Sequence, residues 1–415
     1  MKSTVSKYLA ILALSISGGS IYTLPYIKYV FYDTQLEVMG ITNTQSGFLL
    51  SMYALGCMLS YIPGGLITDK ISPRKAIAFS LFGTAGLGVL YSLTFSYTLS
   101  LVIWFLFALT TAFVFWTSLL KAIGMAGDQD EQARLYGLYY AGNGITGAVV
   151  NSLALQAFTY GTDPRQSLFY AVIVMAGAML VSGLLVMFLV SDEKTESAEA
   201  DKFDFSVVGG LVKNPMLWCF SFIVFAGYAI YSSASYFTPY LTNVVGLSVE
   251  ESGVFSIIRT YLFYLLAPFG GYLADRVLRS TSKLFIILFA ILGVVIAGVM
   301  FLPSSMSTFA ISLYTLIPGA VGLMLYGLVF SVVREAGIPL KVAGTAIGVA
   351  SIIGYAPDFF FSAMFGSWLD AHGNGGYNMI FTFLAAVAVM GMVMSLIVFK
   401  RSVRQERFRP ASQEA

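Results

Sequence analysis

Charged residues are scarce in this sequence. Only 11% of its 415 residues are Asp, Glu, Lys or Arg, whereas soluble domains carry about 25%. Hydrophobic residues make up 58%. A soluble fold of this length could not bury so much apolar surface, so the composition excludes an ordinary soluble protein and indicates a chain surrounded by lipid.

Histidine and cysteine are almost absent. The single histidine, His372, falls in a predicted loop, and Cys57 and Cys219 fall in separate apolar segments. The sequence has no cluster of His, Cys and carboxylate residues at metal-ligand spacing and no GxxxxGK[ST] loop to hold ATP. We therefore expect no metal, no cofactor and no structural disulfide.

Long apolar runs take the place of charge. Twelve segments are about 20 residues long, which is the length that a helix needs to cross a bilayer. They lack the alternating pattern of barrel strands, so we predict an all-α membrane protein with twelve transmembrane helices. The segments are 8–32, 44–67, 76–95, 98–121, 135–159, 167–190, 215–240, 250–273, 284–302, 308–333, 342–367 and 378–399.

The basic residues favour one side of the membrane. If both termini lie on the same side, that side carries all 23 Lys and Arg residues except Lys28, Arg165 and Arg259. Cytoplasmic loops are enriched in Lys and Arg, so both termini are predicted to be cytoplasmic, in a cell inner (plasma) membrane. A cleaved signal peptide is the alternative for the first segment, which is too long for a signal sequence. Basic residues beside membrane segments indicate lipid, not nucleic acid, as the partner.

The two halves of the chain repeat each other at an offset of 206 residues. Ser46-Gly47 matches Ser252-Gly253, Gly64-Gly65 matches Gly270-Gly271, and Asp69-Lys70 matches Asp275-Arg276. Duplicated halves with a site between them are common in transporters. We predict a six-helix bundle at 1–190, a cytoplasmic linker at 191–213 and a second six-helix bundle with a short cytoplasmic tail at 214–415.

A glycine–acid–base motif recurs in both halves, at 65–75 and 271–276. Both copies resemble the loop motif of the major facilitator superfamily. The Asp-Lys-x-Ser-Pro-Arg form of the first copy is similar to the organophosphate–phosphate antiporter branch and its YihN-like bacterial relatives. The segments 98–121 and 135–159 lack the residues typical of multidrug exporters.

The resemblance implies two pseudo-symmetric six-helix bundles that work by alternating access. It also implies that the loop motif is a cytoplasmic latch, in which Asp69 caps a helix end and pairs with a cation such as Arg134. A role of the basic residues in topology alone is the alternative. The implied latch residues are Gly65, Asp69, Arg74, Arg134, Gly271, Asp275 and Arg276.

Hydroxyl-bearing aromatic residues follow one face of the segment 215–240. Tyr228, Tyr231, Ser232, Ser235 and Tyr236 have the spacing i, i+3, i+4, i+7, i+8, which places them on one side of a helix. The resemblance implies that the first, fourth, seventh and tenth helices line a central cavity. We expect this face to line it, and the alternative is packing between helices.

The first and fourth segments carry similar faces. The candidates for substrate binding there are Tyr22, Tyr26, Lys28, Trp116 and Lys121. For Lys28 and Lys121 the alternative is that the side chains extend to the membrane interface. If both face the cavity, its net charge is positive, which favours an anion.

Arg259 and Asp358 lie inside apolar segments, where a charge costs about 3 kcal/mol or more. Each is about nine residues from the outer end of its segment, which is roughly 13 Å at 1.5 Å per residue. Three interpretations stay open. Arg259 binds an anionic substrate while Asp358 orients it or carries a proton; the two form a permanent ion pair; or they form a gate.

Residues beside this pair extend the candidate site. Tyr355 precedes Asp358 by three positions, and Pro357 directly precedes it, so the helix is predicted to unwind locally there. The offset of 206 places Tyr53 where the second half has Arg259, so the charge is not repeated. An unrepeated charge is more typical of a site than of a scaffold.

These observations predict a secondary transporter, not an enzyme, that moves a small polar organic anion bearing a phosphate, sulfonate or carboxylate. Coupling is by proton symport through Asp358 or by anion exchange, and we expect a monomer. The alternatives are a carrier of a neutral solute or lipid, with Arg259 and Asp358 as a gating pair, and a transporter-like sensor.

Overall fold

The described part of the chain is helical throughout, with turns between the helices and no β-strand. The computed structural model describes residues 4–68, 71–127, 131–191, 210–303, 305–338 and 343–407. Each of the twelve predicted segments, numbered here spans 1 to 12 in chain order, is occupied by helix. The predicted all-α membrane fold is confirmed.

Nine helices within these ranges are long and apolar enough to cross a membrane. The other three spans contain α1 (Thr4–Ile21), α3 (Asn43–Thr68) and α7 (Gln132–Phe158). The helices α3 and α7 have spanning length, with 26 and 27 residues.

Six spans are continuous helices or nearly so. They are α3, α4 (Pro73–Thr94), α7, α8 (Pro164–Leu189), α14 (Thr281–Gly298, extended by η8, Val299–Phe301) and α18 (Gly375–Arg407). Capping explains where several begin. Ser72, Asp163 and Ser280 each accept a hydrogen bond from the backbone N–H three residues later, which satisfies a donor that the first turn leaves without an intrahelical partner.

The other six spans are interrupted. Span 1 is α1 and η1 (Ile27–Tyr29), and α2 (Tyr32–Met39) follows it. Span 4 is α5 (Tyr97–Ala108), η2 (Leu109–Phe113) and α6 (Phe115–Gly124). Span 7 is α10 (Pro215–Ser233), η4 (Ala234–Tyr236), α11 (Phe237–Tyr240) and η5 (Leu241–Val245). Span 8 is α12 (Val249–Thr260), η6 (Leu262–Leu266), α13 (Ala267–Tyr272) and η7 (Leu273–Leu278). Span 10 is α15 (Thr308–Tyr326) and η9 (Val329–Val333), and span 11 is α16 (Ala343–Gly354) and α17 (Pro357–His372). Such breaks are tolerated at membrane depth only where protein or water satisfies the backbone.

The break in span 1 shows how this happens. Helix α1 ends four residues before Pro25, and the indole Nε1 of Trp104 donates to the Pro25 carbonyl at 3.1 Å. Trp104 is fully buried. Its position in the outer part of span 4 is typical of an interfacial tryptophan, but that interpretation is wrong, because the indole N–H satisfies a carbonyl freed by the break.

The internal contacts of the chain define two compact units. Unit 1 comprises Met1–Ala198, Ser235–Tyr264 and Phe359–Ala371, and unit 2 comprises Glu199–Ala234, Leu265–Asp358 and His372–Ala415. Spans 7, 8 and 11 therefore contribute to both units, and they change unit at η4, at η6 and near the start of α17. The predicted bundles and linker stay a prediction, and residues 192–209 of the linker lie outside the described residues.

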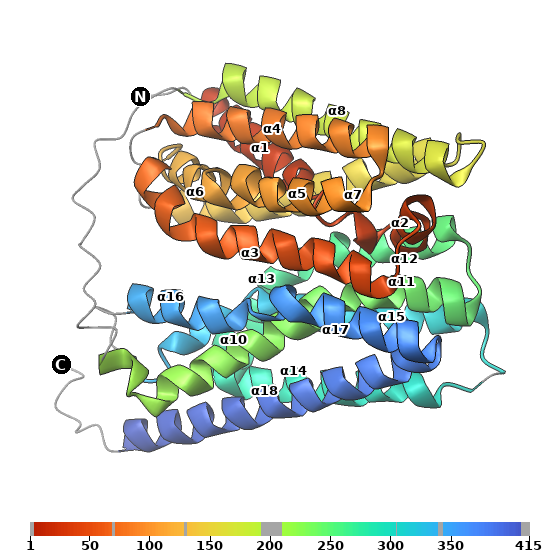
Figure 1. Cartoon of the computed structure of the whole chain (residues 1–415). Helices are drawn as coiled ribbons and strands as arrows, with labels where there is room; N and C mark the ends of the chain where they lie inside the picture. Colours follow the sequence, from red (N-terminus) through yellow and green to blue (C-terminus); the bar gives the residue numbers. More distant parts are fainter. Residues whose placement is uncertain are drawn as a thin grey trace. The chain divides into compact units, whose positions relative to one another are not determined.

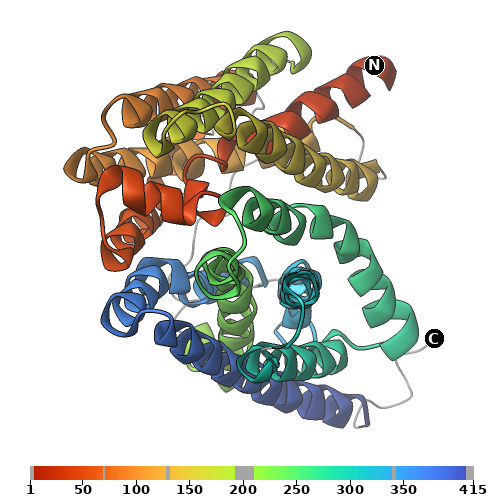
Figure 2. The same cartoon turned by 90° about the vertical axis from the view of Figure 1, so that its right-hand side faces the viewer.

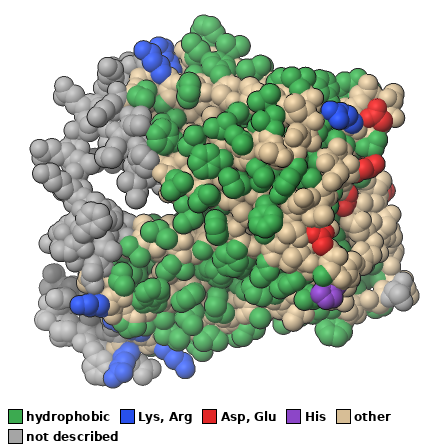
Figure 3. Space-filling model, in the orientation of Figure 1, with side chains coloured by type: hydrophobic (Ala, Val, Ile, Leu, Met, Phe, Trp, Pro, Cys, Tyr) green, Lys and Arg blue, Asp and Glu red, His purple; other side chains and the backbone are tan. Residues whose placement is uncertain are grey.

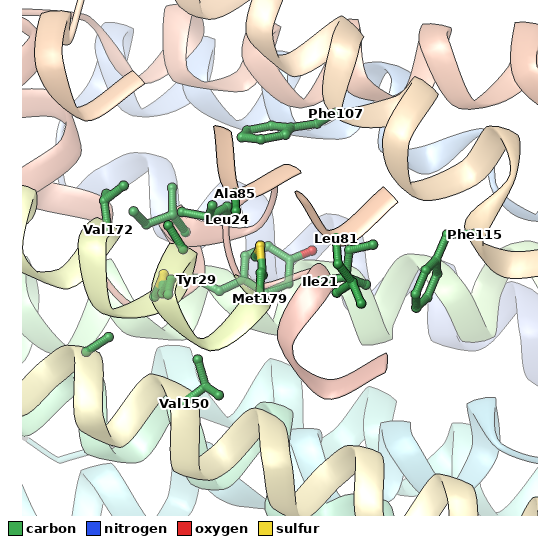
Figure 4. Packing of buried hydrophobic residues seen from close by; sticks show 14 of the residues in the cluster. Ile21, Leu24, Tyr29, Leu81, Ala85, Phe107, Phe115, Val150, Val172 and Met179 are labelled. Carbon is green, nitrogen blue, oxygen red and sulfur yellow. The ribbon is translucent and has the colours of Figure 1, made fainter. Parts of the chain in front are cut away.

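Unit 1 is held together by a continuous apolar core. In Figure 1, α4 and α8 run side by side, and α1 packs on α7 and α8. Figure 4 shows side chains from four elements meeting in this core: Ile21 from α1, Leu81 from α4, Phe107 from α5 and Met179 from α8. All four are fully buried.

Unit 2 is built around α10 and α18. The helix α18, dark blue in Figure 2, runs alongside α14, and α10 packs on α15, α16 and α18. Close approach is possible where Gly354 meets Val224 and where Gly270 meets Met324.

The surface matches a lipid environment. Figure 3 shows hydrophobic side chains across much of the visible face of the described residues. Phe188, Val294 and Phe301 are among the large apolar side chains that are mostly exposed. In a soluble protein such surface marks an interaction site; here it covers the membrane-spanning helices.

Two glycines let α3 and α17 touch within unit 1. A Cβ at Gly47 would overlap the carbonyl of Ser362, and a Cβ at Gly366 would overlap that of Asn43. Asp370 of α17 also accepts hydrogen bonds from the backbone N–H of Asn43 and Thr44 at 3.0 and 2.9 Å. The side chain of Asp370 thus caps the N-terminus of α3.

We expect Gly366→Ala to destabilise the protein by about 1–3 kcal/mol, because the added methyl group must displace backbone. The measurement is the thermal unfolding midpoint in detergent. Gly177→Ala is the matched control, since a Cβ at this helical position of α8 meets nothing within 4 Å, and it should be neutral or stabilising. Equal midpoints for the two variants would contradict the close α3–α17 contact.

Candidate functional site

The carbonyl of Tyr29 is a junction between spans 1, 7 and 8 inside unit 1. Tyr29 lies in η1, after the break in span 1. Its carbonyl accepts hydrogen bonds from the hydroxyls of Thr238, at 3.0 Å, and Ser256. Both donors are buried. The junction fixes α11 and α12 against the end of span 1.

Arg259 is held beside this junction. It lies in the last turn of α12, and its side chain is only 2% exposed. Its Nη1 donates to the hydroxyl of Thr238 at 3.3 Å, and its guanidinium carbon lies 5.4 Å from the centre of the Phe237 ring. The hydroxyl and ring fix the orientation of a buried cation, as a binding group requires.

A second buried cation, Lys28, directly precedes Tyr29 in the chain. The Lys28 ammonium lies 5.3 Å from the centre of the Tyr32 ring and 5.4 Å from that of Tyr236, and Lys28 is 3% exposed. Lys28 precedes Tyr29, and Tyr236 and Phe237 precede Thr238. Unit 1 therefore arranges Lys28 and Arg259 around one three-residue segment, 236–238, which agrees better with a site than with extension of Lys28 to the interface.

The other candidates from spans 1 and 4 are half-buried in unit 1. Tyr26 packs near Tyr29 and Tyr53, with ring centres 5.0 and 5.5 Å away, and Tyr22 meets Phe115 edge-on at 6.2 Å. Trp116 and Lys121 lie in α6. The structure brings Tyr26 to the Lys28–Tyr29 segment, and Trp116 packs against the apolar core of unit 1.

Four tyrosines meet in unit 2. Tyr228 and Tyr231 come from α10, Tyr326 is the last residue of α15, and Tyr355 lies in the turn between α16 and α17. The rings of Tyr231 and Tyr326 stack with centres 4.6 Å apart, and Tyr355 meets Tyr228 edge-on at 4.6 Å. The hydroxyls of Tyr326 and Tyr355 are hydrogen-bonded at 3.2 Å. We name these four residues the tyrosine cluster.

Asp358 joins the tyrosine cluster through Tyr228, whose hydroxyl donates to Oδ2 of Asp358. Asp358 is the second residue of α17, and α16 ends at Gly354, so the unwinding predicted from Pro357 is confirmed. An acid in the first turn is stabilised by the N–H groups and the dipole of the helix. Arg259 belongs to unit 1 and Asp358 to unit 2, so their direct pairing stays a prediction.

The five-residue face predicted on span 7 is split. Tyr228 and Tyr231 belong to the tyrosine cluster, whereas Tyr236 lies in unit 1, where its hydroxyl donates to the Ser362 carbonyl at 3.1 Å. The helix changes to 3-10 geometry at η4, so the 3.6-residue period does not continue beyond Ser233. The hydroxyl of Ser232, the second-last residue of α10, donates to the Ala229 carbonyl of the same helix.

Two residues at the site were missed by the sequence reasoning. Thr238 links Arg259 to the Tyr29 carbonyl, and Tyr326 stacks on Tyr231. The sequence gave no indication that Thr238 belongs to the site, because a single threonine beside Pro239 is typical of packing between helices. Tyr326 could have been found, since the resemblance placed the tenth helix at the cavity.

The family model described as Major Facilitator Superfamily matches residues 9–360 of the chain. The chain belongs to the major facilitator superfamily. It is therefore a membrane transporter and not an enzyme, as the loop motifs predicted. A major facilitator protein works on small molecules, which agrees with the buried polar groups found in both units.

Relatives of this major facilitator chain include transporters of anions by name. The inner membrane protein YihN of Escherichia coli (strain K12) is 31% identical over 97% of this chain and 98% of its own. The glycerol-3-phosphate transporter of Bacillus subtilis (strain 168) is 23% identical over 94% of this chain and 91% of its own. The similarity to YihN confirms the resemblance noted from the first loop motif.

A solved structure shares the fold. The chain superposes with a TM-score of 0.72 on a bacterial homolog of the human lysosomal transporter Spinster in an inward-facing, unoccupied conformation. The match covers 99% of this chain and 100% of that one at 15% sequence identity. At this identity the likeness shows the major facilitator fold and nothing of the substrate.

The implied latch residues are only partly described. Asp69 lies outside the described residues, and Gly65 lies within α3. Arg74 donates to the Met187 carbonyl at 3.3 Å, and Arg134 lies over the Tyr8 ring at 5.5 Å. In the second copy of the motif, Gly271 lies in the last turn of α13, which ends at Tyr272. Asp275 and Arg276 lie on η7, and both are exposed. The latch of this major facilitator protein stays a prediction.

Proposed function

We propose that the protein is a secondary active transporter that moves a small polar organic anion, bearing a phosphate, sulfonate or carboxylate, across a cell inner membrane by alternating access. Both termini lie in the cytoplasm in this proposal. The observation that carries it is the buried Arg259, oriented by Thr238 and Phe237 within a spanning helix. A cation at this depth is costly and usually serves transport.

Two further observations support an anionic substrate. Lys28 is buried against Tyr236 of the same segment, 236–238, so unit 1 offers two positive charges. One relative is named for glycerol-3-phosphate, an organic anion. Arg259 suits a planar or tetrahedral oxyanion because its guanidinium donates several hydrogen bonds in a fixed fork.

Coupling is assigned to Asp358. It lies in a spanning helix at a break, and a carboxylate there can exchange a proton with water on one side of the membrane in each conformation. Proton symport through Asp358 and exchange of one anion for another both fit Arg259 as the anion site. The transport assay with Asp358→Asn described in the Discussion separates them.

The alternatives are a carrier of a neutral solute or lipid in which Arg259 and Asp358 form a gate, and a transporter-like sensor. The gating alternative differs from the proposed anion transporter in the ligand that it predicts. A gate made of two opposite charges needs no anion, so neutral or amphipathic compounds would bind, and loss of Arg259 would leave their affinity unchanged.

A thermal-shift panel tests the proposal. Purified protein is heated with sugar phosphates, sulfonates, carboxylates and neutral sugars. A ligand at 100 times its Kd stabilises the protein by about 2.7 kcal/mol, so we expect one anion class to raise the unfolding midpoint by roughly a few degrees. The shift should be lost in Arg259→Ala and kept in Arg165→Ala. A shift given only by neutral compounds, or kept in Arg259→Ala, would overturn the anion assignment.

A further inference from the structure

Three interrupted helices end at the tyrosine cluster of unit 2. Helix α10 changes to 3-10 geometry after Ser233, α15 ends at Tyr326, and α16 ends at Gly354 just before Tyr355. Breaks of this kind in transporter helices gather at functional sites, because regular helix is abandoned only where the freed backbone is used or satisfied. The cluster is therefore more than packing between helices.

Two contacts of the Asp358 carboxylate stabilise a negative charge on it. The hydroxyl of Tyr228 donates to its Oδ2, and it occupies the first turn of α17. Both interactions favour the ionised form, since a hydrogen bond to a charged acceptor is roughly twice as strong as one to a neutral acceptor. Among the described residues of unit 2, the titratable side chains in this arrangement include Tyr228 of α10, which bonds to Asp358, Tyr355 before α17, which packs on Tyr228, and Tyr326 of α15, which bonds to Tyr355.

The ring of Tyr228 is fixed by its neighbours. Its centre lies 4.6 Å from that of Tyr355, 5.5 Å from that of Tyr326 and 6.1 Å from that of Tyr231. Tyr228 itself is buried, whereas Asp358 and the other three tyrosines are half-buried. The hydroxyl is thus aimed at Asp358 by packing, and Asp358 is less buried than Tyr228.

We propose that Tyr228 is a positioning residue that sets the pH at which Asp358 takes up a proton and links this event to α10. The inference rests on the proposed proton role of Asp358. One proton from water adds to the carboxylate to give a neutral acid, while Tyr228 keeps its own proton. The acceptor then loses its charge, the hydrogen bond weakens, and α10 is released from the start of α17.

Infrared difference spectroscopy of the protein in lipid vesicles tests this without a substrate. The carbonyl stretch of a protonated carboxylic acid is followed during a pH titration of the wild type, and the band missing from Asp358→Asn is that of Asp358. We expect Tyr228→Phe to move the midpoint of this band upward by about one to two pH units. The phenylalanine keeps the ring and hence the packing, which the thermal unfolding midpoint verifies.

Tyr231→Phe is the matched control. Tyr231 lies on the same helix and in the same cluster, and it stacks on Tyr326. Its variant should titrate within a few tenths of a pH unit of the wild type. An unmoved midpoint in Tyr228→Phe, or an equal movement in Tyr231→Phe, would overturn the positioning role.

The outcomes also separate this inference from the proposed function. If no band disappears in Asp358→Asn, Asp358 takes up no proton, and the positioning role and the proton symport fall together. If the Asp358 band titrates but Tyr228→Phe leaves it unmoved, only the positioning role falls. The anion assignment of Arg259 is independent of the infrared measurement, because it depends on the thermal-shift panel.

Discussion

Replacing Arg259 with alanine abolishes transport while the amount of protein in the membrane stays near the wild-type level. The guanidinium is the buried cation that the substrate's anionic group is proposed to bind, and its removal leaves Thr238 and Phe237 with no positive charge to orient. A hydrogen bond to a charged group contributes about 1.5–3 kcal/mol, so the loss of each such bond lowers the affinity by roughly 10- to 150-fold. Uptake of a radiolabelled anion into proteoliposomes measures the loss.

Two variants make the Arg259 result specific. Arg259→Lys keeps the charge but loses the forked donor geometry, so we expect transport between those of the wild type and the alanine variant. Arg165→Ala removes an arginine of the same unit that lies over the Phe95 ring and donates to the Thr94 carbonyl, and it should transport normally. Wild-type uptake by Arg259→Ala would remove this residue from the site.

Asp358→Asn abolishes accumulation driven by a pH gradient but leaves exchange of substrate across the membrane. Asparagine keeps the shape and the hydrogen bond from Tyr228 but cannot take up a proton, so binding persists while coupling is lost. The measurement compares uphill uptake under an imposed pH gradient with exchange at equal pH, in the same vesicles. Full gradient-driven uptake by this variant would exclude Asp358 as the proton carrier and leave anion exchange.

Asp33 is the acid to compare with Asp358, because it is also half-buried. It lies in α2, after span 1, where burial raises its pKa from the ordinary value of 3.8 against the opposing effect of hydrogen bonds from Asn243 and Thr242. A raised pKa makes the ionised form of Asp33 less favourable in the folded protein, so its charge lowers stability above that pKa. Asp33→Asn should therefore be tolerated and keep gradient-driven uptake. If Asp33→Asn loses that uptake and Asp358→Asn keeps it, the proton role belongs to Asp33.

Sequence and structure agree on which segments are helices, and they disagree on where helices stop. Each predicted span is occupied by helix, because about 20 apolar residues have one stable form in lipid. Interruptions were foreseen only at prolines, as with Pro357 before Asp358. The change to 3-10 geometry at Ala234–Tyr236 carries no proline, and it divides the predicted face of span 7 between two units.

The sequence by itself determined the membrane setting, the helix count, the family and the unusual position of Arg259 and Asp358. These follow from local properties, namely hydropathy, the cost of a charge in lipid and a repeated loop motif. Only the tertiary structure decided the partners: Thr238 and the Tyr29 carbonyl beside Arg259, Tyr236 beside Lys28, and Tyr228 on Asp358. Such partners come from segments far apart in the chain, and a helical period indicates which residues share a face but not which other helix that face meets.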